Sequence, residues 1–579
     1  MIAPSERRRY VVIPRRLYSS CLGLVVAALC FSGDATAQAP KDTTTGYVIS
    51  DATVTARCAK CHKADSAGHM SRLSYMRKTP EGWETSLRRM VTLNDVQLAP
   101  ADARAIVKYL ANQQGLAPEE VRAGRFESER RSIDYRYTAD ARTETVCKAC
   151  HSLGRVITQR RTREEWELLV ATHRGYYPVS DFQAFRRFGP PPPDSAGQPH
   201  PMDQAITHLA RAFPLRTPEW AAWSATMRPP PITGTWLISG QQPGRGGFVG
   251  RLTITKAGAD DEFVTTASYR FTGGGPAVTR QGRAMVYTGF QWRGRSTETG
   301  KPADSAWREV LFIEPGWQEI SGRWFNGGYD ENGIDVKLTR LTGAPAVVGV
   351  LPRGLRKGGS GQDIVIVGAN LPPNVPAGQI DLGPGVRVER VARSTSDELS
   401  LRVRVDSAAV IGERDVFVAG ASLAKGAAVY DKVSRIKVTP AAGMARVGGV
   451  RFPKQFVQFD AFAYNDGADG KADTPDDLAL GRVEVTWKLE EYGVTYDDDD
   501  LKFVGTIDAR GLFTPNVDGP NPQRSGSRNN IGDVWVVATY NASDNGTSRP
   551  IRARAHLLVT VPLYIRFDPW NLAAGGPLQ

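Results

Sequence analysis

Cysteine is scarce in this chain, with only six residues among 579. Two of them, Cys21 and Cys30, lie near the N-terminus, and the other four form two closely spaced pairs. If the first two are removed with a targeting segment, no cysteine remains outside those pairs. We therefore expect no disulfide framework, even if the chain is exported to an oxidising compartment.

Long apolar runs and basic tracts are also missing. After residue 37, no segment has the about 20 consecutive apolar residues that a membrane-spanning helix needs. The net charge of +12 falls to about +9 without residues 1–37, because five arginines and two acidic residues leave with them. No basic run interleaved with aromatics indicates nucleic-acid binding. The remaining positive charge fits docking of an acidic partner, and plain solubility explains it equally well.

The first 37 residues have the pattern of a secretory signal peptide. A basic region with five arginines precedes the apolar segment 21–31, and Ala35-Thr36-Ala37 before Gln38 provides a small-residue cleavage site. The alternative is a membrane anchor, but eleven apolar residues fall well short of the about 20 that span a bilayer. We expect a signal peptide over 1–37 and a mature chain in the bacterial periplasm.

Each remaining cysteine pair is followed directly by a histidine, in the strings Cys58-Ala59-Lys60-Cys61-His62 and Cys147-Lys148-Ala149-Cys150-His151. The pattern C-x-x-C-H is the attachment signal for c-type haem, in which the cysteines form thioethers and the histidine binds the iron. One such string also arises by chance, in zinc sites or in redox pairs. Two of them, in a mature chain with no other cysteine, predict two covalently bound haems.

An internal repeat surrounds these motifs. The pattern Arg-basic-Thr-x-Glu-x-Trp occurs over residues 77–83 and again over 160–166. Thr79 and Thr162 are good helix N-caps, and Glu165 stands at the position that completes a capping box with Thr162. The repeat therefore predicts a helix that starts at the threonine of each lobe and carries the tryptophan on its inner face.

Seven residues beyond the tryptophan of each repeat lies a residue that can bind haem iron: Met90 in the first lobe and His173 in the second. Both residue types serve opposite a proximal histidine in haem proteins. The sequence predicts Met90 as the distal ligand of the first haem and His173 as that of the second. It leaves other ligands open, namely Met70, Met76, His200 and His208.

The two ligand sets imply a direction of electron flow. A thioether ligand raises the reduction potential relative to imidazole, so the haem with His173 should have the lower potential. Electrons would enter at the second haem and leave from the first. Two six-coordinate irons favour electron transfer over oxygen or peroxide chemistry.

The fold class follows from a change of pattern at Arg228-Pro-Pro-Pro231. Apolar residues before this point have helical spacing, and those after it alternate in short strands between turn residues. We expect a multidomain chain in which an all-α dihaem cytochrome c domain precedes three all-β domains. The expected bounds are 38–228 for the haem domain (lobes at about 38–122 and 123–228), 229–343 for a β-barrel-like domain, and 344–438 and 439–579 for two immunoglobulin-like sandwiches.

With two C-x-x-C-H motifs, this repeat and three β domains, the chain resembles the α subunit of quinohemoprotein amine dehydrogenase over essentially its whole mature length. The resemblance implies a heterotrimer with a β-propeller subunit and a small subunit that carries cysteine tryptophylquinone. The quinone would oxidise a primary amine, and the haems would pass electrons to a periplasmic small copper protein or cytochrome c. Since this chain has no cysteine to spare for the quinone, it would contain no catalytic residue.

The resemblance also assigns the haem ligands residue by residue. Cys58, Cys61 and His62 with Met90 would hold one haem, and Cys147, Cys150 and His151 with His173 the other. Two other functions stay open: a stand-alone dihaem redox carrier with β binding modules, and a dihaem peroxidase, which needs an open iron.

One acidic loop in the last β segment has the density of oxygen ligands typical of a calcium site. It runs from Asn465 to Asp477 but lacks the glutamate that closes an EF-hand. A solvated acidic turn is the alternative.

Overall fold

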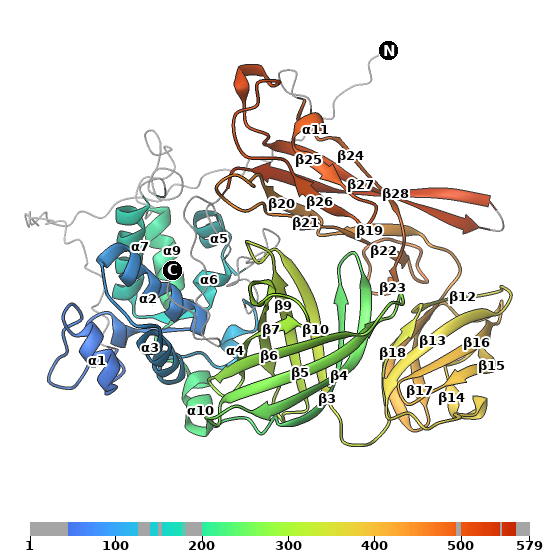
Figure 1. The fold of residues 1–579 in the computed structure, drawn as a ribbon, viewed down its shortest axis with the longest axis horizontal. Helices are drawn as coiled ribbons and strands as arrows, with labels where there is room; N and C mark the ends of the chain where they lie inside the picture. Colours follow the sequence, from blue (N-terminus) through green and yellow to red (C-terminus); the bar gives the residue numbers. More distant parts are fainter. Residues whose placement is uncertain are drawn as a thin grey trace, which may run out of the picture. The chain divides into compact units, whose positions relative to one another are not determined.

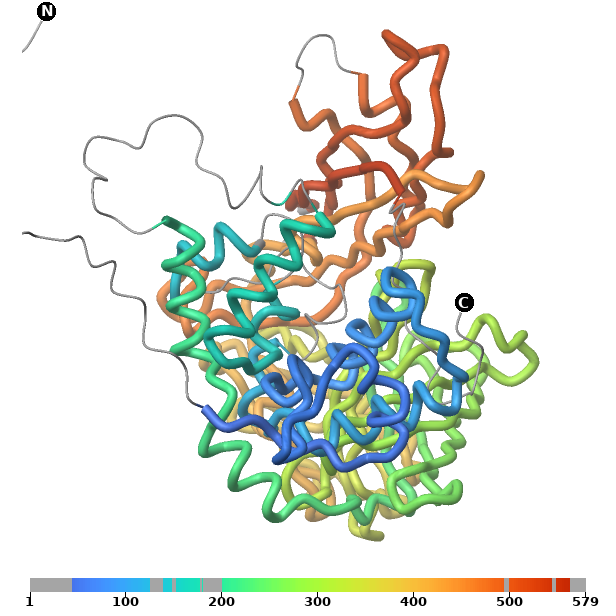
Figure 2. The backbone as a smooth tube through the Cα atoms, turned by 90° about the vertical axis from the view of Figure 1, so that its left-hand side faces the viewer, coloured from blue at the N-terminus to red at the C-terminus, as the bar shows by residue number. Residues whose placement is uncertain are grey.

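The computed structural model describes residues 44–124, 139–148, 153–177, 180, 200–493, 499–544 and 547–562. The expected signal peptide, Cys150 and His151 lie outside these residues. Most of the regular structure that it describes is β, in 28 strands, and the longer helices all precede residue 227 (Figure 1). Figure 2 shows the same chain as a tube, with the first helices in blue and the next in blue-green. Within the described ranges, no helix is both long and apolar enough to cross a membrane.

The first lobe comprises α1 (Ala52–Cys58), η1 (Leu73–Tyr75), β1 (Met76–Lys78), α2 (Pro80–Asn94), α3 (Pro100–Gln113) and α4 (Pro118–Val121). The predicted start of the repeat helix is confirmed in α2. The Thr79 hydroxyl accepts the N–H of Gly82 at 3.2 Å, and Pro80 occupies the first helical position. The apolar faces of α2 and α3 enclose one core that includes Trp83, Leu87, Ile106, Val107 and Leu110.

The second lobe comprises α5 (Ala141–Lys148), α6 (Gly154–Ile157), β2 (Gln159–Arg161), α7 (Arg163–Tyr176) and α9 (Pro201–Ala212), and α10 (Pro218–Thr226) leads to the next domain. Thr162 caps α7 as predicted, since its hydroxyl accepts the N–H of Glu165 at 3.3 Å. The reciprocal half of the predicted capping box is not formed. The Glu165 carboxylate pairs instead with Arg72 and Arg161, and the Thr162 N–H donates to the carbonyl of Tyr75.

The prediction of an all-α N-terminal domain is wrong. β1 and β2 pair in antiparallel register, with Arg77 opposite Arg160, and form a two-stranded ribbon that joins the two lobes. Helical periodicity could not reveal these strands, because each is three residues long and two of the three residues are basic. Each strand precedes an N-cap threonine whose backbone is extended, so the repeat places its basic residues in β conformation just before the helix.

A closed eight-stranded barrel follows the haem region. Its strands are β3 (Gly234–Gln242), β4 (Gly246–Lys256), β5 (Glu262–Phe271), β6 (Val278–Tyr287), β7 (Gln291–Glu298), β8 (Trp307–Ile313), β9 (Glu319–Asn326) and β10 (Asn332–Arg340). Each strand pairs with the next in the sequence, and β10 returns to β3, so no open edge remains. Buried and exposed residues alternate along β5, which directs the aromatic core inward.

Polar contacts join the first lobe to the barrel. Lys108 of α3 pairs with Asp261 at 2.8 Å, and the Asn112 side chain accepts the backbone N–H of Thr288 at 2.7 Å. Tyr287 of β6 belongs to the core of the first lobe. The barrel therefore supports α3 directly.

The third segment consists of two four-stranded sheets around one core. One sheet contains β11 (Ala346–Leu351), β13 (Gln362–Ala369), β16 (Glu398–Val405) and β15 (Val386–Ser394), and the other contains β12 (Gly354–Arg356), β18 (Ala421–Tyr430), β17 (Gly412–Val418) and β14 (Ile380–Asp381).

The last segment differs from a two-sheet sandwich, because its described residues form three sheets around one core. The sheets contain β19 (Arg435–Thr439), β22 (Asp460–Asn465) and β23 (Leu478–Arg482); β20 (Ala442–Arg446), β28 (Thr547–Thr560), β27 (Gly532–Asp544) and β24 (Thr486–Glu491); and β21 (Val457–Gln458), β26 (Leu512–Pro515) and β25 (Gly505–Ile507). The short helix α11 (Asp500–Phe503) packs beside them.

Candidate haem sites

The first C-x-x-C-H motif begins at the C-terminal end of α1. The helix is capped by Asp51, whose carboxylate accepts the N–H of Val54 at 2.8 Å, and it ends at Cys58. The carbonyl of Cys58 then accepts the N–H groups of Cys61 at 3.2 Å and His62 at 2.9 Å. This tight turn gathers both thiols and the imidazole within one turn of chain, as attachment of a single haem requires.

The imidazole of His62 is held in the orientation of an iron ligand. Its Nδ1 lies 2.9 Å from the carbonyl oxygen of Ser71, which assigns the proton to Nδ1 and leaves Nε2 to bind a metal. Burial lowers the pKa of His62, and this favours the neutral ring that serves as ligand. The donor set of two thiols and an oriented imidazole fits a haem.

The Cys58 thiol does not resemble that of a redox cysteine. Burial, with a smaller contribution from Cys61, raises the pKa of Cys58 to about 11. Redox and zinc-binding cysteines function as thiolates, which a raised pKa disfavours. Among the residues with described positions, no cluster of three or more His, Cys, Asp or Glu side chains could hold a metal ion.

Only part of the second motif is described. Cys147 lies in α5 and packs against the core of the second lobe, where burial and then Asp140 raise the pKa of its thiol to about 12. Cys150 and His151 lie outside the described residues. The prediction that they complete a second haem site therefore stays untested.

Met90 lies on α2, two helical turns after Trp83 and on the same face. Trp83 is buried in the core of the first lobe, and Met90 is half-buried. Of the two alternatives, Met70 is buried in that core with its N–H bonded to Ser74, and Met76 lies on β1. The described contacts do not join Met90 to His62, so the role of Met90 as an iron ligand stays a prediction.

His173 occupies the equivalent place on α7. Its Nδ1 lies 2.8 Å from the carbonyl oxygen of Leu169, so Nε2 is the nitrogen that would bind iron. Burial lowers its pKa, as at His62. The two alternative histidines both have protein partners. His200 caps α9 by accepting the N–H of Met202, and Nδ1 of His208 lies 3.6 Å from the carboxylate of Asp140. The assignment of His173 as ligand is likewise not tested by these contacts.

The most important residues that sequence reasoning missed are buried charges between the lobes. Arg77 and Arg160 both pair with Glu120, at 2.8 and 3.0 Å. On the other face of the ribbon, Glu165 pairs with Arg72 and with Arg161. The only signal in the sequence was the repeated pair of basic residues before each threonine.

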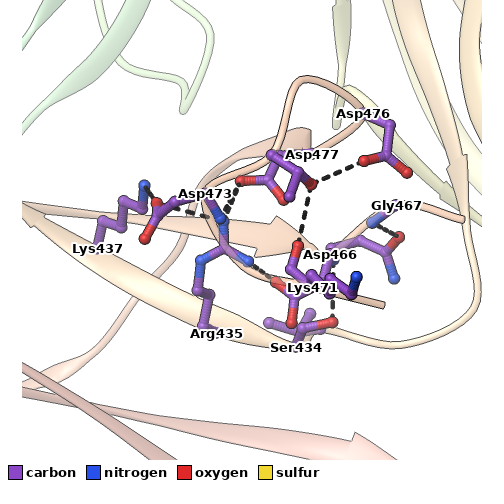
Figure 3. A network of polar contacts seen from close by, with 12 residues as sticks. Ser434, Arg435, Lys437, Asp466, Gly467, Lys471, Asp473, Asp476 and Asp477 are labelled. Carbon is purple, nitrogen blue, oxygen red and sulfur yellow. Dashed lines mark hydrogen bonds and ion pairs between the residues drawn. The ribbon is translucent and has the colours of Figure 1, made fainter. Parts of the chain in front are cut away.

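Two basic side chains pair with three of the five aspartates in the acidic loop at 465–477. Arg435 pairs with Asp466 and Asp477, and Lys437 pairs with Asp473 at 2.6 Å (Figure 3). Asp476 accepts the backbone N–H groups of residues 468 and 469. These contacts hold the carboxylates in an ion-pair network and give no support to a calcium site.

A pair of lobes built around C-x-x-C-H motifs, with an oriented and neutral histidine after the first, defines a haem-binding protein. Four family models agree: the quinohemoprotein amine dehydrogenase alpha-subunit haem-binding model matches residues 48–220, and the models of alpha-subunit domains II, III and IV match 229–341, 344–431 and 436–571. The chain belongs to the family of quinohemoprotein amine dehydrogenase alpha subunits, which are parts of a multisubunit oxidoreductase.

Other comparisons are less informative. None of the curated proteins compared with the chain matches it. Among solved structures, a redesigned β-barrel is 12% identical with a TM-score of 0.17, over 19% of this chain and 91% of that one. Human protocadherin-24 EC1-2 is 13% identical with a TM-score of 0.15, over 38% of this chain and 99% of that one. Scores this low establish no shared fold.

Proposed function

We propose that this chain is the dihaem electron-transfer subunit of a periplasmic amine dehydrogenase. Bound haem would supply one-electron transfer from a cysteine tryptophylquinone on a small partner subunit to a small copper protein or cytochrome c. A β-propeller subunit would complete the heterotrimer. The observation that carries the proposal is the His62 ring, which Ser71 holds in the tautomer of an axial ligand directly after two closely spaced thiols.

The chain's own residues would attach and orient the haems. Cys58, Cys61, Cys147 and Cys150 would form the thioethers. The bond from His62 to Ser71 fixes the plane of the first proximal ring and increases the basicity of its Nε2.

Each remaining ligand would come from a defined part of the lobes. His151 would be the second proximal ligand. α2 and α7 would present Met90 and His173 as distal ligands, because each helix is fixed by its threonine cap and its buried tryptophan.

The substrate amine would be oxidised elsewhere in the complex. All four cysteines of the predicted mature chain lie in the two motifs, so none is left to form the quinone. The barrel, whose described interior is mainly aromatic and aliphatic, would serve as support and as an interface.

Purification of the native complex tests the proposal. Addition of a primary amine should reduce both haems in the complex, whereas the same amine should leave the haems of the isolated chain oxidised. The isolated chain should still accept electrons from dithionite and return them to an oxidant. Amine turnover by the single chain would contradict the proposal, as would a complex whose haems stay oxidised when amine is added.

A further inference from the structure

The ribbon between the lobes carries a different set of basic side chains on each of its two faces. Since side chains alternate along a strand, Arg77 and Arg160 share one face, and Lys78 and Arg161 lie on the other. All four are buried. Burial of so much positive charge is costly unless each group finds an anion or hydrogen-bond acceptors.

The first face meets that requirement. Arg77 donates to the Glu120 carboxylate through both terminal nitrogens at 2.8 Å, and its Nε donates to the carbonyl of Leu215 at 2.7 Å. Its remaining donors reach Gly115 and Thr217 at 2.9 Å. This arginine is thus saturated by described protein groups, and the face needs no further ligand.

On the second face, the described residues do not supply an anion or acceptors for every buried cation. Lys78 and Arg161 lie there together with Arg72 and Arg89, and we call these four residues the cation cluster. Its only described carboxylate partner is Glu165, which pairs with Arg72 at 2.8 Å and with Arg161 at 3.3 Å.

Lys78 has no carboxylate partner among the described residues. Its ammonium is bonded to the hydroxyl of Ser86 at 2.6 Å and lies 5.2 Å from the centre of the Trp83 ring. Its side chain is only 5% exposed.

Two buried donors, one in the cluster and one next to it, lack an acceptor among the described residues: Nε of Arg89 and the indole Nε1 of Trp166. Trp166 is 1% exposed, and Arg161 lies 5.7 Å from the centre of its ring. The equivalent tryptophan of the first lobe, Trp83, donates to the carbonyl of Gln114 at 3.2 Å. The repeat therefore satisfies one indole within the protein and leaves the other for a different acceptor.

The pKa shifts of the cluster agree with this lack of anionic partners among the described residues. Burial, followed by the charges of Arg161 and Arg89, holds the pKa of Lys78 well below its ordinary value. Burial also lowers the pKa values of Arg161 and Arg89. An anion bound among these groups would remove that penalty.

The cation cluster adjoins both of the histidines assigned to iron. Arg72 directly follows Ser71, whose carbonyl oxygen accepts from Nδ1 of His62 at 2.9 Å. Arg161 lies beside Trp166 on α7, the helix that also carries His173. An anion in the cluster would therefore lie beside the haems.

We propose that the cation cluster binds haem propionate carboxylates, with Arg89 and Trp166 as hydrogen-bond donors and Lys78 as the counter-charge. The inference rests on the proposed function, since it requires haem attached at the C-x-x-C-H motifs. Thioether attachment uses the vinyl groups of haem and leaves its propionates as the anionic groups that must be neutralised when they are buried.

Lys78→Met in the exported holoprotein is the direct test, because it removes one charge with little change in side-chain volume. Loss of a nearby positive charge destabilises the reduced haem relative to the oxidised form, so the midpoint potential of at least one haem should fall. Lys78→Arg should keep a potential close to that of the wild type. Lys108→Met is the matched control: its ammonium pairs with Asp261 near the surface, and its potentials should stay unchanged.

Trp166→Phe supplies a second readout that needs no change of charge. Redox-difference infrared spectra, with haem labelled at the propionate carboxyls, should show shifted carboxylate bands in both Trp166→Phe and Lys78→Met. Bands that match those of the wild type in Trp166→Phe, or potentials of Lys78→Met equal to those of Lys108→Met, would overturn the inference. Haem content by mass separates this from failure of haem attachment, which would leave even the wild-type chain without haem. Failure of the proposed function would instead show as wild-type haems that stay oxidised when amine is added to the native complex.

Discussion

Glu120 holds the two lobes together, and its neutralisation should destabilise the haem region strongly. It is the described carboxylate shared by the buried guanidinium groups of Arg77 and Arg160. Removal of one partner from a buried ion pair costs about 3–5 kcal/mol, because the other charge stays buried without compensation. Glu120→Gln keeps the shape of the side chain and leaves two such charges, so we expect at least the lower end of that range.

The neighbouring residue on α4 provides a matched control. Glu119 is exposed, so Glu119→Gln should change the free energy of unfolding by less than about 0.5 kcal/mol. Urea unfolding followed by circular dichroism in the haem absorption band reports on the lobes without the signal of the β domains. A double-mutant cycle of Glu120→Gln with Arg160→Met should then show a coupling energy of about 1–3 kcal/mol. Equal stability of Glu120→Gln and Glu119→Gln would refute the reasoning.

The same pair predicts a pH dependence. Burial alone would raise the pKa of Glu120, but hydrogen bonds from Arg77 and the charges of Arg77 and Arg160 outweigh it and lower the pKa. A carboxyl with a depressed folded-state pKa stabilises the fold above its unfolded pKa of about 4.3, and that contribution is lost as the pH falls further. The stability difference between wild type and Glu120→Gln should therefore be full at pH 7 and shrink below about pH 4. A difference that does not depend on pH would contradict this.

Three further predictions concern the haems. Met90→Ala should abolish the sulfur-to-iron absorption band and lower the potential of one haem only; survival of the band would make Met70 or Met76 the ligand. His173→Met should raise the potential of the other haem by part of the about 0.8 V range that axial ligands set, and unchanged redox waves would point to a different histidine. Mass spectrometry of the exported chain should show an N-terminus at Gln38 and two haem additions, whereas a single addition would contradict one of the two motifs.

The sequence alone predicted the features that depend on neighbours along the chain. The starts of α2 and α7 are confirmed because a threonine side chain needs only the N–H groups of the next turn to cap a helix. The C-x-x-C-H motif is equally local, and four family models now place the chain in the family that the motifs and the repeat indicated. The ligand roles of Met90 and His173 stay predictions.

The tertiary structure decided whatever depends on groups far apart in the sequence. No local pattern marks Arg77 and Arg160 as buried, yet the pairing of the lobes makes them buried strand residues opposite each other. Glu165 was expected to cap its own helix, but a guanidinium from the other lobe binds its carboxylate more strongly than a backbone N–H would.

These partners could not be read from periodicity, because local patterns record which face of an element is apolar and not which element covers it. A three-residue strand has too few residues to show alternation, and its stability comes from the strand that pairs with it. The sequence thus determined where the two C-x-x-C-H motifs lie and where α2 and α7 begin. The pairing of the lobes determined which charges are buried between them, because burial and counter-charge exist only once the chain has folded.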